Sequence, residues 1–240
     1  MAEKVGFPEI LSFGPTGYGD DLAWGLLTSI SIAVLAYGIG LLIGIIGAMG
    51  KLTGSTLTRT LLNGYTTLVR AVPELILILI LFYAGTSALN QILQSFGLPP
   101  FAINGFLAAV CVLGFVQGAY STEVLRAAIQ AIPIGQIEAA KAYGMSPFLA
   151  FKRITLPALL PFAIPGLANL WLNATKDTSL IAVVGYTELT LATKQAAGNT
   201  KMYFLFYMTA AAIYLIITLV SKRGFSWLER RVRLGERQER

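Results

Sequence analysis

The feature that most constrains this chain is an apolar run of 28 residues near its amino terminus. The run extends from Leu22 to Met49. As an α-helix it would be about 42 Å long at 1.5 Å per residue, which is enough to cross a hydrocarbon core ~30 Å thick with some tilt. We therefore expect a membrane span. Within it, Ala36, Gly40 and Gly44 recur every fourth residue, and such small side chains let two helices pack closely in lipid.

The composition also excludes a soluble globule. Hydrophobic residues make up 55% of the 240 and charged residues 12%, and the mean hydropathy is +0.69, which leaves too little polar surface. The chain has no histidine and one cysteine, Cys111, inside an apolar run. A disulfide framework and a histidine-containing metal site are therefore excluded, and the thiol is interpreted as a small core side chain. Because no basic segment leads into an apolar run at Met1, we expect no cleavable signal peptide.

Four further apolar segments bring the expected number of crossings to five, in an all-α integral membrane protein. Pro73 interrupts the second segment and removes a backbone donor, so that helix is expected to kink or restart there. The connections at 51–60, 90–102 and 186–202 are expected to be polar loops. The four segments are Leu61–Ala88, Ile103–Ile132, Ala158–Ala174 and Tyr203–Val220.

The positions of Lys and Arg predict the orientation. Twelve of the eighteen fall on the side of the 133–157 connection and four on the other, a bias that makes the first side cytoplasmic. We therefore expect an extracytoplasmic tail at 1–21, a transmembrane domain at 22–220 and a basic cytoplasmic tail at 221–240. Because the basic residues gather on the cytoplasmic side, the net charge of +6 does not indicate binding of nucleic acid. Trp227 and the arginines of that tail indicate either a segment lying near anionic membrane lipid or a solvated charge cluster.

One polar interlude, Pro133–Pro157, separates the third and fourth spans. Its first part is rich in alanine and straight side chains, which favour a helix, and Gly144 stands where a helix C-cap favours positive φ. Pro147 suits the first turn of a second helix, and Pro157 ends that helix or opens the next segment. The sequence thus predicts a helix, a turn and a helix outside the bilayer. Any polytopic protein needs such loops, so this pattern alone does not assign a function.

The interlude also contains the complete pattern E-A-A-x3-G-x9-I-x-L-P. This pattern resembles that of ABC importer membrane subunits, where it couples the spans to the ATPases. Segments 47–52, 64–74, 117–123 and 176–180 narrow the resemblance to the polar amino acid permease family, especially its histidine, lysine, arginine, ornithine and octopine branch. The positions that fill the pattern are Glu138, Ala139, Ala140, Gly144, Ile154, Leu156 and Pro157.

The resemblance covers nearly all of the chain from Leu22 onward and implies both a fold and partners. The fold would be that of a type I ABC importer permease in the bacterial inner membrane, working by alternating access. The partners would be two ATP-binding cassette subunits, a second permease chain, identical or homologous, and a periplasmic or lipid-anchored amino-acid-binding protein. ATP and magnesium would bind to the ATPase subunits. The chain itself shows no phosphate loop, no nucleophile and base, and no metal-ligand cluster, so we expect neither a cofactor nor an enzyme.

Charged side chains within the spans are candidates for function, because each costs at least ~2.5 to 3.5 kcal/mol on insertion scales. Glu123 and Arg126 are three residues apart on one helical face, so we interpret them as a structural pair. The other charges stand beside helix breaks, where cations suit the carboxylate of an amino acid and acids its ammonium. Alternatively, these charges pair with each other and hold the bundle together. The substrate-pathway candidates are Arg70, Glu74, Tyr120, Asn169, Asn173, Lys176 and Asp177.

The sequence leaves the solute and some rival classes open. The charge balance indicates a zwitterion, while a basic side chain, as in histidine, arginine, lysine, ornithine or an opine, follows only from the resemblance. Another small polar solute, such as glutamine, is the alternative. A secondary transporter usually carries an internal repeat, and none is visible. A membrane enzyme would need a catalytic constellation, which is missing as well.

Overall fold

The structure is a computed structural model that describes residues 7–14, 17–100 and 104–233. Over these ranges it is all-helical, and five helices are long and apolar enough to cross a membrane, which confirms the expected number. Lys4, Arg237 and Arg240 enter the charge count but lie outside the described residues. The five helices are Gly19–Thr53, Glu74–Ser95, Gly105–Gln130, Pro147–Val184 and Tyr203–Val232.

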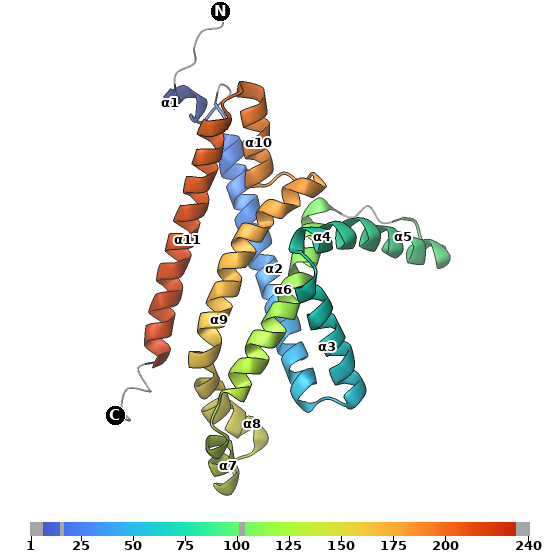
Figure 1. The fold of residues 1–240 in the computed structure, drawn as a ribbon, viewed down its shortest axis with the longest axis vertical. Coiled ribbons are helices and arrows are strands. Elements are labelled where there is room, and N and C mark those ends of the chain that lie inside the picture. The colour runs from blue at the N-terminus through green and yellow to red at the C-terminus, as the bar shows by residue number, and fades with distance from the viewer. Residues whose placement is uncertain (1–6, 15–16, 101–103, 234–240) are drawn as a thin grey trace, which may run out of the picture. The chain divides into compact units, whose positions relative to one another are not determined.

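Figure 1 follows the helices along the chain. Three short stretches depart from α-helical geometry: π-helical turns at Ile80–Ala84 and Phe151–Thr155 and a 3-10 helix at Thr178–Val184. The α-helices are α1 (Phe7–Ile10), α2 (Gly19–Thr53), α3 (Thr56–Ala71), α4 (Glu74–Leu79), α5 (Gly85–Ser95), α6 (Gly105–Gln130), α7 (Ile134–Ala142), α8 (Pro147–Ala150), α9 (Leu156–Asp177), α10 (Leu189–Thr200) and α11 (Tyr203–Arg233).

The chain forms two compact units, and α2, α6, α9 and α11 each contribute one end to each unit. The first unit comprises Met1–Ala36, Leu75–Leu113 and Ala174–Ile217. Its core joins α1, α2, α10 and α11, and the rings of Tyr18 and Phe206 meet edge to face at 5.5 Å. The buried core residues are Ile10, Leu22, Leu189, Ala196, Ala197 and Phe206.

The second unit comprises Tyr37–Glu74, Gly114–Asn173 and Thr218–Arg240. The small residues of α2 lie directly on α6 in this unit, since a Cβ added to Gly44 would stand 2.4 Å from Cβ of Ser121. Any larger side chain would push the two helices apart, so the expected close packing at the glycines is confirmed. The core beside this crossing consists of Ala48, Leu125, Ala128, Ile132, Leu159 and Ala163.

The break at Pro73 occurs as expected, but the boundaries around it differ. α3 ends at Ala71, Val72 is extended (φ −95°, ψ 137°), and α4 begins at Glu74. Residues before proline avoid helical backbone, and proline suits the start of a helix. The second candidate span therefore starts at Glu74 and not at Leu61, because the residues from Leu61 to Ala71 belong to the separate helix α3.

Helices extend into all three connections that the sequence predicts as loops. α2 continues to Thr53 and α3 begins at Thr56, because Ser55 caps α3 by accepting a hydrogen bond from the amide of Thr58 (3.3 Å). α5 extends to Ser95, beyond the expected end of the second span. The connection before the last span contains the 12-residue helix α10. Polar composition does not exclude a helix that is capped and packed on neighbours.

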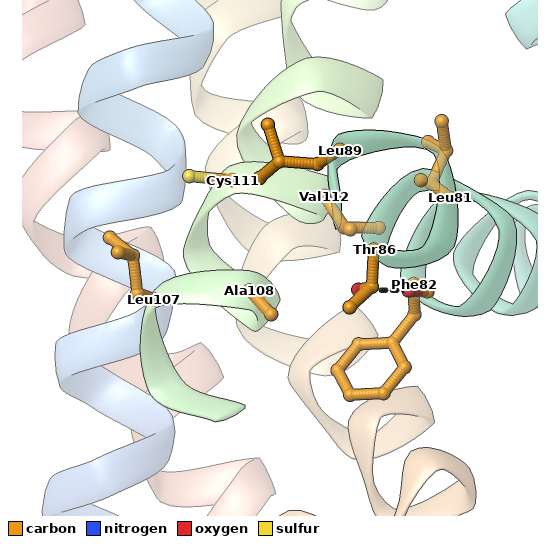
Figure 2. A pocket seen from close by; sticks show the side chains of 9 residues that line it. Leu81, Phe82, Thr86, Leu89, Leu107, Ala108, Cys111 and Val112 are labelled. Atoms are coloured by element: carbon orange, nitrogen blue, oxygen red, sulfur yellow. Dashed lines mark hydrogen bonds between the residues drawn. The ribbon is translucent and has the colours of Figure 1, made fainter. Parts of the chain in front are cut away.

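Two residues have different surroundings from those expected. Ile10, in the segment 1–21 that the sequence predicts to be an extracytoplasmic tail, is buried in the core of the first unit. Cys111, interpreted as a core side chain, is exposed and lines a groove of about 240 Å³ together with Leu81, Phe82 and Val112 (Figure 2). An apolar run predicts apolar surroundings, but in a membrane these can be lipid or another chain.

Candidate coupling element and intramembrane polar clusters

The coupling candidate begins with a short helix that ends at a glycine. After α7 (Ile134–Ala142), Gly144 adopts a φ of +70°. Its amide donates to the carbonyl of Lys141 over 2.9 Å, and the amide of Met145 donates to that of Ala140 over 3.1 Å. This is the Schellman arrangement, which satisfies the last carbonyls of a helix and favours glycine because a positive φ strains other residues. The expected turn at Gly144 is confirmed.

A second helical piece leads from this turn into the fourth span. The Oγ of Ser146 accepts a hydrogen bond from the amide of Leu149 (3.4 Å), and Pro147 occupies the first helical position. The helix continues through the π turn at Phe151–Thr155 into α9, so Pro157 opens α9. Because proline has no amide hydrogen for the carbonyl four residues back, it favours the wider turn just before it.

Four motif residues line a groove between α7 and the start of α9. They are Ala139, Ala140, Ile154 and Pro157, and the groove has a volume of about 480 Å³. Ala140 is only 2% exposed, so its small side chain permits close packing inside this chain. The sequence indicates that the small side chains of both alanines permit the close approach of a partner, but only Ala139 is exposed.

Other residues of the element either pack on the core of the second unit or are exposed. Ile137 packs against the core of the second unit and holds α7 in place. Glu138 and Leu156 are exposed, as are the rings of Tyr143 (84%) and Phe148 (75%). The exposed carboxylate of Glu138 and the exposed ring of Tyr143 are therefore free to contact a partner.

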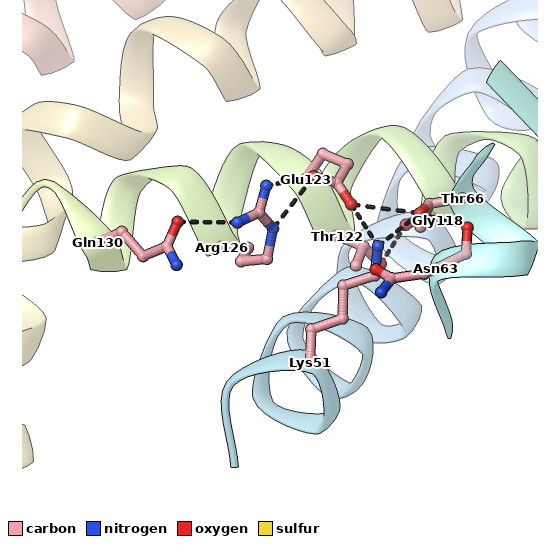
Figure 3. Close-up of polar contacts among 8 residues, drawn as sticks. All are labelled: Lys51, Asn63, Thr66, Gly118, Thr122, Glu123, Arg126 and Gln130. Carbon is pink, nitrogen blue, oxygen red and sulfur yellow. Dashed lines mark hydrogen bonds and ion pairs between the residues drawn. The ribbon is translucent and has the colours of Figure 1, made fainter. Parts of the chain in front are cut away.

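Glu123 is the centre of the main charge cluster (Figure 3). Its Oε2 accepts from Nη2 and Nε of Arg126 at 2.8 and 3.1 Å, and its Oε1 contacts Nζ of Lys51 at 2.5 Å. Thr66 bonds both Lys51 Nζ (2.5 Å) and Glu123 Oε1 (3.2 Å), and Arg126 also donates to Gln130 (2.8 Å). The expected pair is confirmed as part of a cluster that joins α2, α3 and α6.

The surroundings of Lys51 differ from those expected from the sequence. The sequence predicts a polar loop from residue 51, but the side chain of Lys51 is only 5% exposed and is paired with a carboxylate 72 positions later in the chain. The reason is that α2 extends past Lys51, which places the ammonium against α6. Two cations share one carboxylate here, so the cluster keeps a net positive charge.

The substrate-pathway candidates of the second unit lie on four helices. Arg70 is exposed in the last turn of α3, and Glu74 is partly exposed at the start of α4. Neither makes an ion pair with any residue that the structure describes. Tyr120 on α6 and Asn173 on α9 are partly exposed, and Asn169 is exposed. The structure therefore does not support mutual pairing of Arg70 and Glu74.

Lys176 and Asp177 belong to the first unit. Lys176 is exposed in the last turn of α9, and Asp177, which is partly exposed and has an interaction partner, ends that helix. The 3-10 helix at Thr178–Val184 follows, so the break that the sequence placed around Lys176 is confirmed.

Glu188 is a buried acid that the sequence interpretation missed. It is 0% exposed and caps α10 by accepting a hydrogen bond from the amide of Leu191 over 2.9 Å. Its other oxygen accepts from Ser29 (3.1 Å) and Tyr214 (3.2 Å), and Ser29 in turn accepts from the amide of Leu189 (3.1 Å). Burial raises the pKa of Glu188 above its ordinary value, although these hydrogen bonds oppose the rise.

Little in the sequence could have revealed this site. Glutamate is not among the preferred capping residues, which are Ser, Thr, Asp and Asn. Its partners Ser29 and Tyr214 are distant in the sequence. Only the tertiary structure brings α2, α10 and α11 together around one carboxylate.

Comparison with known proteins identifies the family. Residues 40–234 match the model of the family described as "Binding-protein-dependent transport system inner membrane component". The chain is 42% identical to the nopaline transport system permease protein NocQ of Agrobacterium fabrum over 234 residues, which cover 93% of this chain and 98% of the relative. It is 37% identical to the histidine/lysine/arginine/ornithine permease HisQ of Escherichia coli, over 91% of this chain and 96% of HisQ.

Solved structures show the same fold. A chain of an amino acid ABC transporter crystallised with histidines aligns with a TM-score of 0.75 at 30% identity, over 89% of this chain and 95% of that one. The inward-facing MetNI methionine transporter aligns with a TM-score of 0.68 at 18% identity, over 90% and 95%. The helix–glycine–helix element and the family match over residues 40–234 lead to one conclusion: this chain belongs to the family of binding-protein-dependent transport system inner membrane components.

Proposed function

We propose that the chain is the permease subunit of an ATP-driven importer for polar, basic amino acids or opines. The observation that carries this function is the complete coupling pattern on an exposed helix–glycine–helix element that is anchored to the spans at Ile137. The relatives add the solute class, since NocQ is named for nopaline and HisQ for histidine, lysine, arginine and ornithine. Arginine, histidine, octopine and nopaline are the solutes to test first.

The complete transporter would contain subunits that this chain lacks. Two ATP-binding cassette subunits would dock on the 133–157 element and bind ATP and magnesium, a second permease chain would complete the pathway, and a periplasmic amino-acid-binding protein would deliver the solute. The chain would lie in the bacterial inner membrane with its amino terminus outside. Residues 22–220 would be the transmembrane domain, with the tails 1–21 outside and 221–240 inside, although α11 continues as a helix through residues 221–233.

The solute would meet opposite charges at two helix breaks. Arg70 and Lys176 would attract its carboxylate, and Glu74 and Asp177 its ammonium or basic side chain. Tyr120, Asn169 and Asn173 would supply neutral hydrogen-bonding groups. The exposure of Arg70 and Glu74, and the lack of an ion pair on either within the described chain, support this role, because a charge inside a membrane protein normally contacts water or a partner.

Uptake by the reconstituted complex tests the function. Proteoliposomes that contain this permease, its sister chain and the ATPases are expected to take up arginine only with ATP and the binding protein. Glu74→Gln, at equal assembly, should weaken uptake of arginine and histidine more than uptake of glutamine. Arginine uptake driven by an ion gradient in the absence of the ATPases would instead establish a secondary transporter. Unchanged selectivity of Glu74→Gln would remove that carboxylate from the pathway.

A further inference from the structure

Helix α3 carries two exposed stripes beside the face that packs on its own unit. Its packed face includes the buried side chains of Thr66 and Val69. Both stripes repeat at intervals of four and three residues, so each follows one side of a helix. All eight residues of the stripes are exposed. The apolar stripe consists of Leu57, Leu61, Gly64 and Leu68, and the polar stripe of Thr60, Asn63, Thr67 and Arg70.

Two side-chain contacts of α3 fix its position along α6. The hydroxyl of Tyr65 donates to the carbonyl of Phe115 over 2.5 Å, and Thr66 bonds Glu123 over 3.2 Å. Phe115 and Glu123 lie on either side of the middle of α6, a 26-residue candidate span. The residues of α3 next to Tyr65 therefore lie near mid-depth, and these include Asn63 and Thr67.

A polar face at this depth needs a polar environment. The side chains of Asn63, Thr67 and Arg70 make no hydrogen bond or ion pair with other described residues. Hydrocarbon strongly disfavours an amide and a guanidinium without partners. By contrast, Leu61 and Leu68, at matching depths on the same helix, are 64% and 65% exposed and suit lipid or an apolar partner. The polar side of α3 thus suits contact with water, and the adjacent apolar side suits contact with lipid or an apolar protein surface.

We propose that the polar stripe of α3 forms a wall of the water-filled solute pathway, an inference that rests on the importer function proposed above. The hydroxyl of Thr67 and the amide of Asn63 can each donate and accept hydrogen bonds, and the hydroxyl of Thr60, which donates to the carbonyl of Thr56 over 2.9 Å, can still accept one. They therefore suit both the carboxylate and the ammonium of a zwitterionic solute. Successive neutral contacts hold a solute weakly enough to release it. Arg70 ends the stripe and attracts the carboxylate toward the break at Pro73.

Reactivity of single cysteines tests this assignment. Asn63→Cys and Thr67→Cys, with Leu61→Cys and Leu68→Cys as neighbours on the apolar stripe, are made in a Cys111→Ala version of the complete transporter. The probe is a small cationic methanethiosulfonate added in water. Cysteines of the polar stripe are expected to react at least about tenfold faster, because a thiol kept from water is less often the reactive thiolate. Arginine at saturating concentration should slow the polar pair and leave the apolar pair unchanged.

Every other pattern contradicts the proposal. If the cysteines of both stripes react with the probe at equal rates, water reaches both stripes equally and the polar stripe is not a wall of the pathway. Slow reaction of Thr67→Cys, together with its oxidative cross-linking to a second permease chain, would show that a protein covers the polar stripe. If a variant fails to assemble with its ATPases, Thr60→Cys and Leu57→Cys provide a second matched pair on the same stripes.

The same preparations separate this inference from the proposed function. ATP-dependent arginine uptake is measured for the Cys111→Ala parent and for the unmodified transporter. Without ATP-dependent uptake in either, the importer function fails. With normal uptake in both and an unreactive polar stripe, only the pathway assignment of α3 is wrong.

Discussion

Glu123 holds two cations from different helices, and its neutralisation should therefore cost more than the loss of one hydrogen bond. Glu123→Gln would leave Lys51, at 5% exposure, and Arg126 facing each other without a carboxylate. Removal of one partner from a buried ion pair costs roughly 3 to 5 kcal/mol. We expect a loss of stability near the lower end of that range, because Arg126 is 32% exposed. Thermal unfolding of the purified complex measures it.

Arg126→Gln is the matched control for that change. It leaves the pair between Lys51 and Glu123 in place and removes only the more exposed cation, so we expect a loss of about 1 kcal/mol or less. A larger loss for Arg126→Gln than for Glu123→Gln would contradict the arrangement in which Glu123 is the shared centre.

The raised pKa of Glu188 predicts how the stability of the folded protein changes with pH. Its pKa is raised by burial from the ordinary value of 4.5, so the folded protein binds its proton more tightly than the unfolded chain. The resulting stabilisation is fully present below pH 4.5 and is lost as the pH rises through the raised pKa. The melting temperature of the native protein should fall over that interval more than that of Glu188→Gln, which is neutral throughout. Parallel melting curves of the two proteins against pH would contradict the shift.

At the scale of elements, the turn between α7 and α8 depends on one backbone conformation. A Cβ at Gly144 would meet nothing within 4 Å, so Gly144→Val would act through its φ of +70° alone, at a cost of roughly 1–2 kcal/mol. We expect a folded permease that loses co-purifying ATPases and ATP-driven uptake. Glu138→Lys, which reverses an exposed charge on α7, should have the same effect without any strain.

Gly135 provides a control on the same helix. It is exposed, has no positive φ and would also meet nothing with an added Cβ. Gly135→Ala should therefore assemble normally and can slightly favour α7, since alanine is the better helix former. Normal uptake by both Gly144→Val and Glu138→Lys would remove the 133–157 element from the coupling mechanism.

At the scale of the whole molecule, the bias of basic residues predicts which connections face the cytoplasm. Single cysteines in a Cys111→Ala background report this, because Thr53, Gln94, Gln136 and Asn199 are all exposed. In intact cells, Thr53→Cys and Gln136→Cys should resist a membrane-impermeant thiol reagent, whereas Gln94→Cys and Asn199→Cys should react. All four should react after the cells are opened. Labelling of Gln136→Cys from outside would reverse the proposed orientation and remove the coupling role.

Features that depend on neighbouring residues follow from the sequence alone. Pro73 interrupts a helix through its missing amide hydrogen, Gly144 makes a turn through its freedom at positive φ, and Glu123 and Arg126 pair because they are three residues apart. The five spans follow equally from composition along the chain. Each of these predictions needed only a short stretch of sequence and the chemistry of its residues.

Contacts between distant helices, in contrast, are known from the tertiary structure alone. Lys51 joins Glu123 because α2 extends past its expected end and packs on α6. Glu188 is buried because Ser29 and Tyr214 reach it from two distant helices, and α10 forms where composition indicated a loop. The polar stripe of α3 can be assigned a role only because the contacts of Tyr65 and Thr66 fix its position along α6. Hydrophobicity determines that a helix enters the membrane, but it does not determine which face meets a neighbour, because lipid and protein interior are equally apolar.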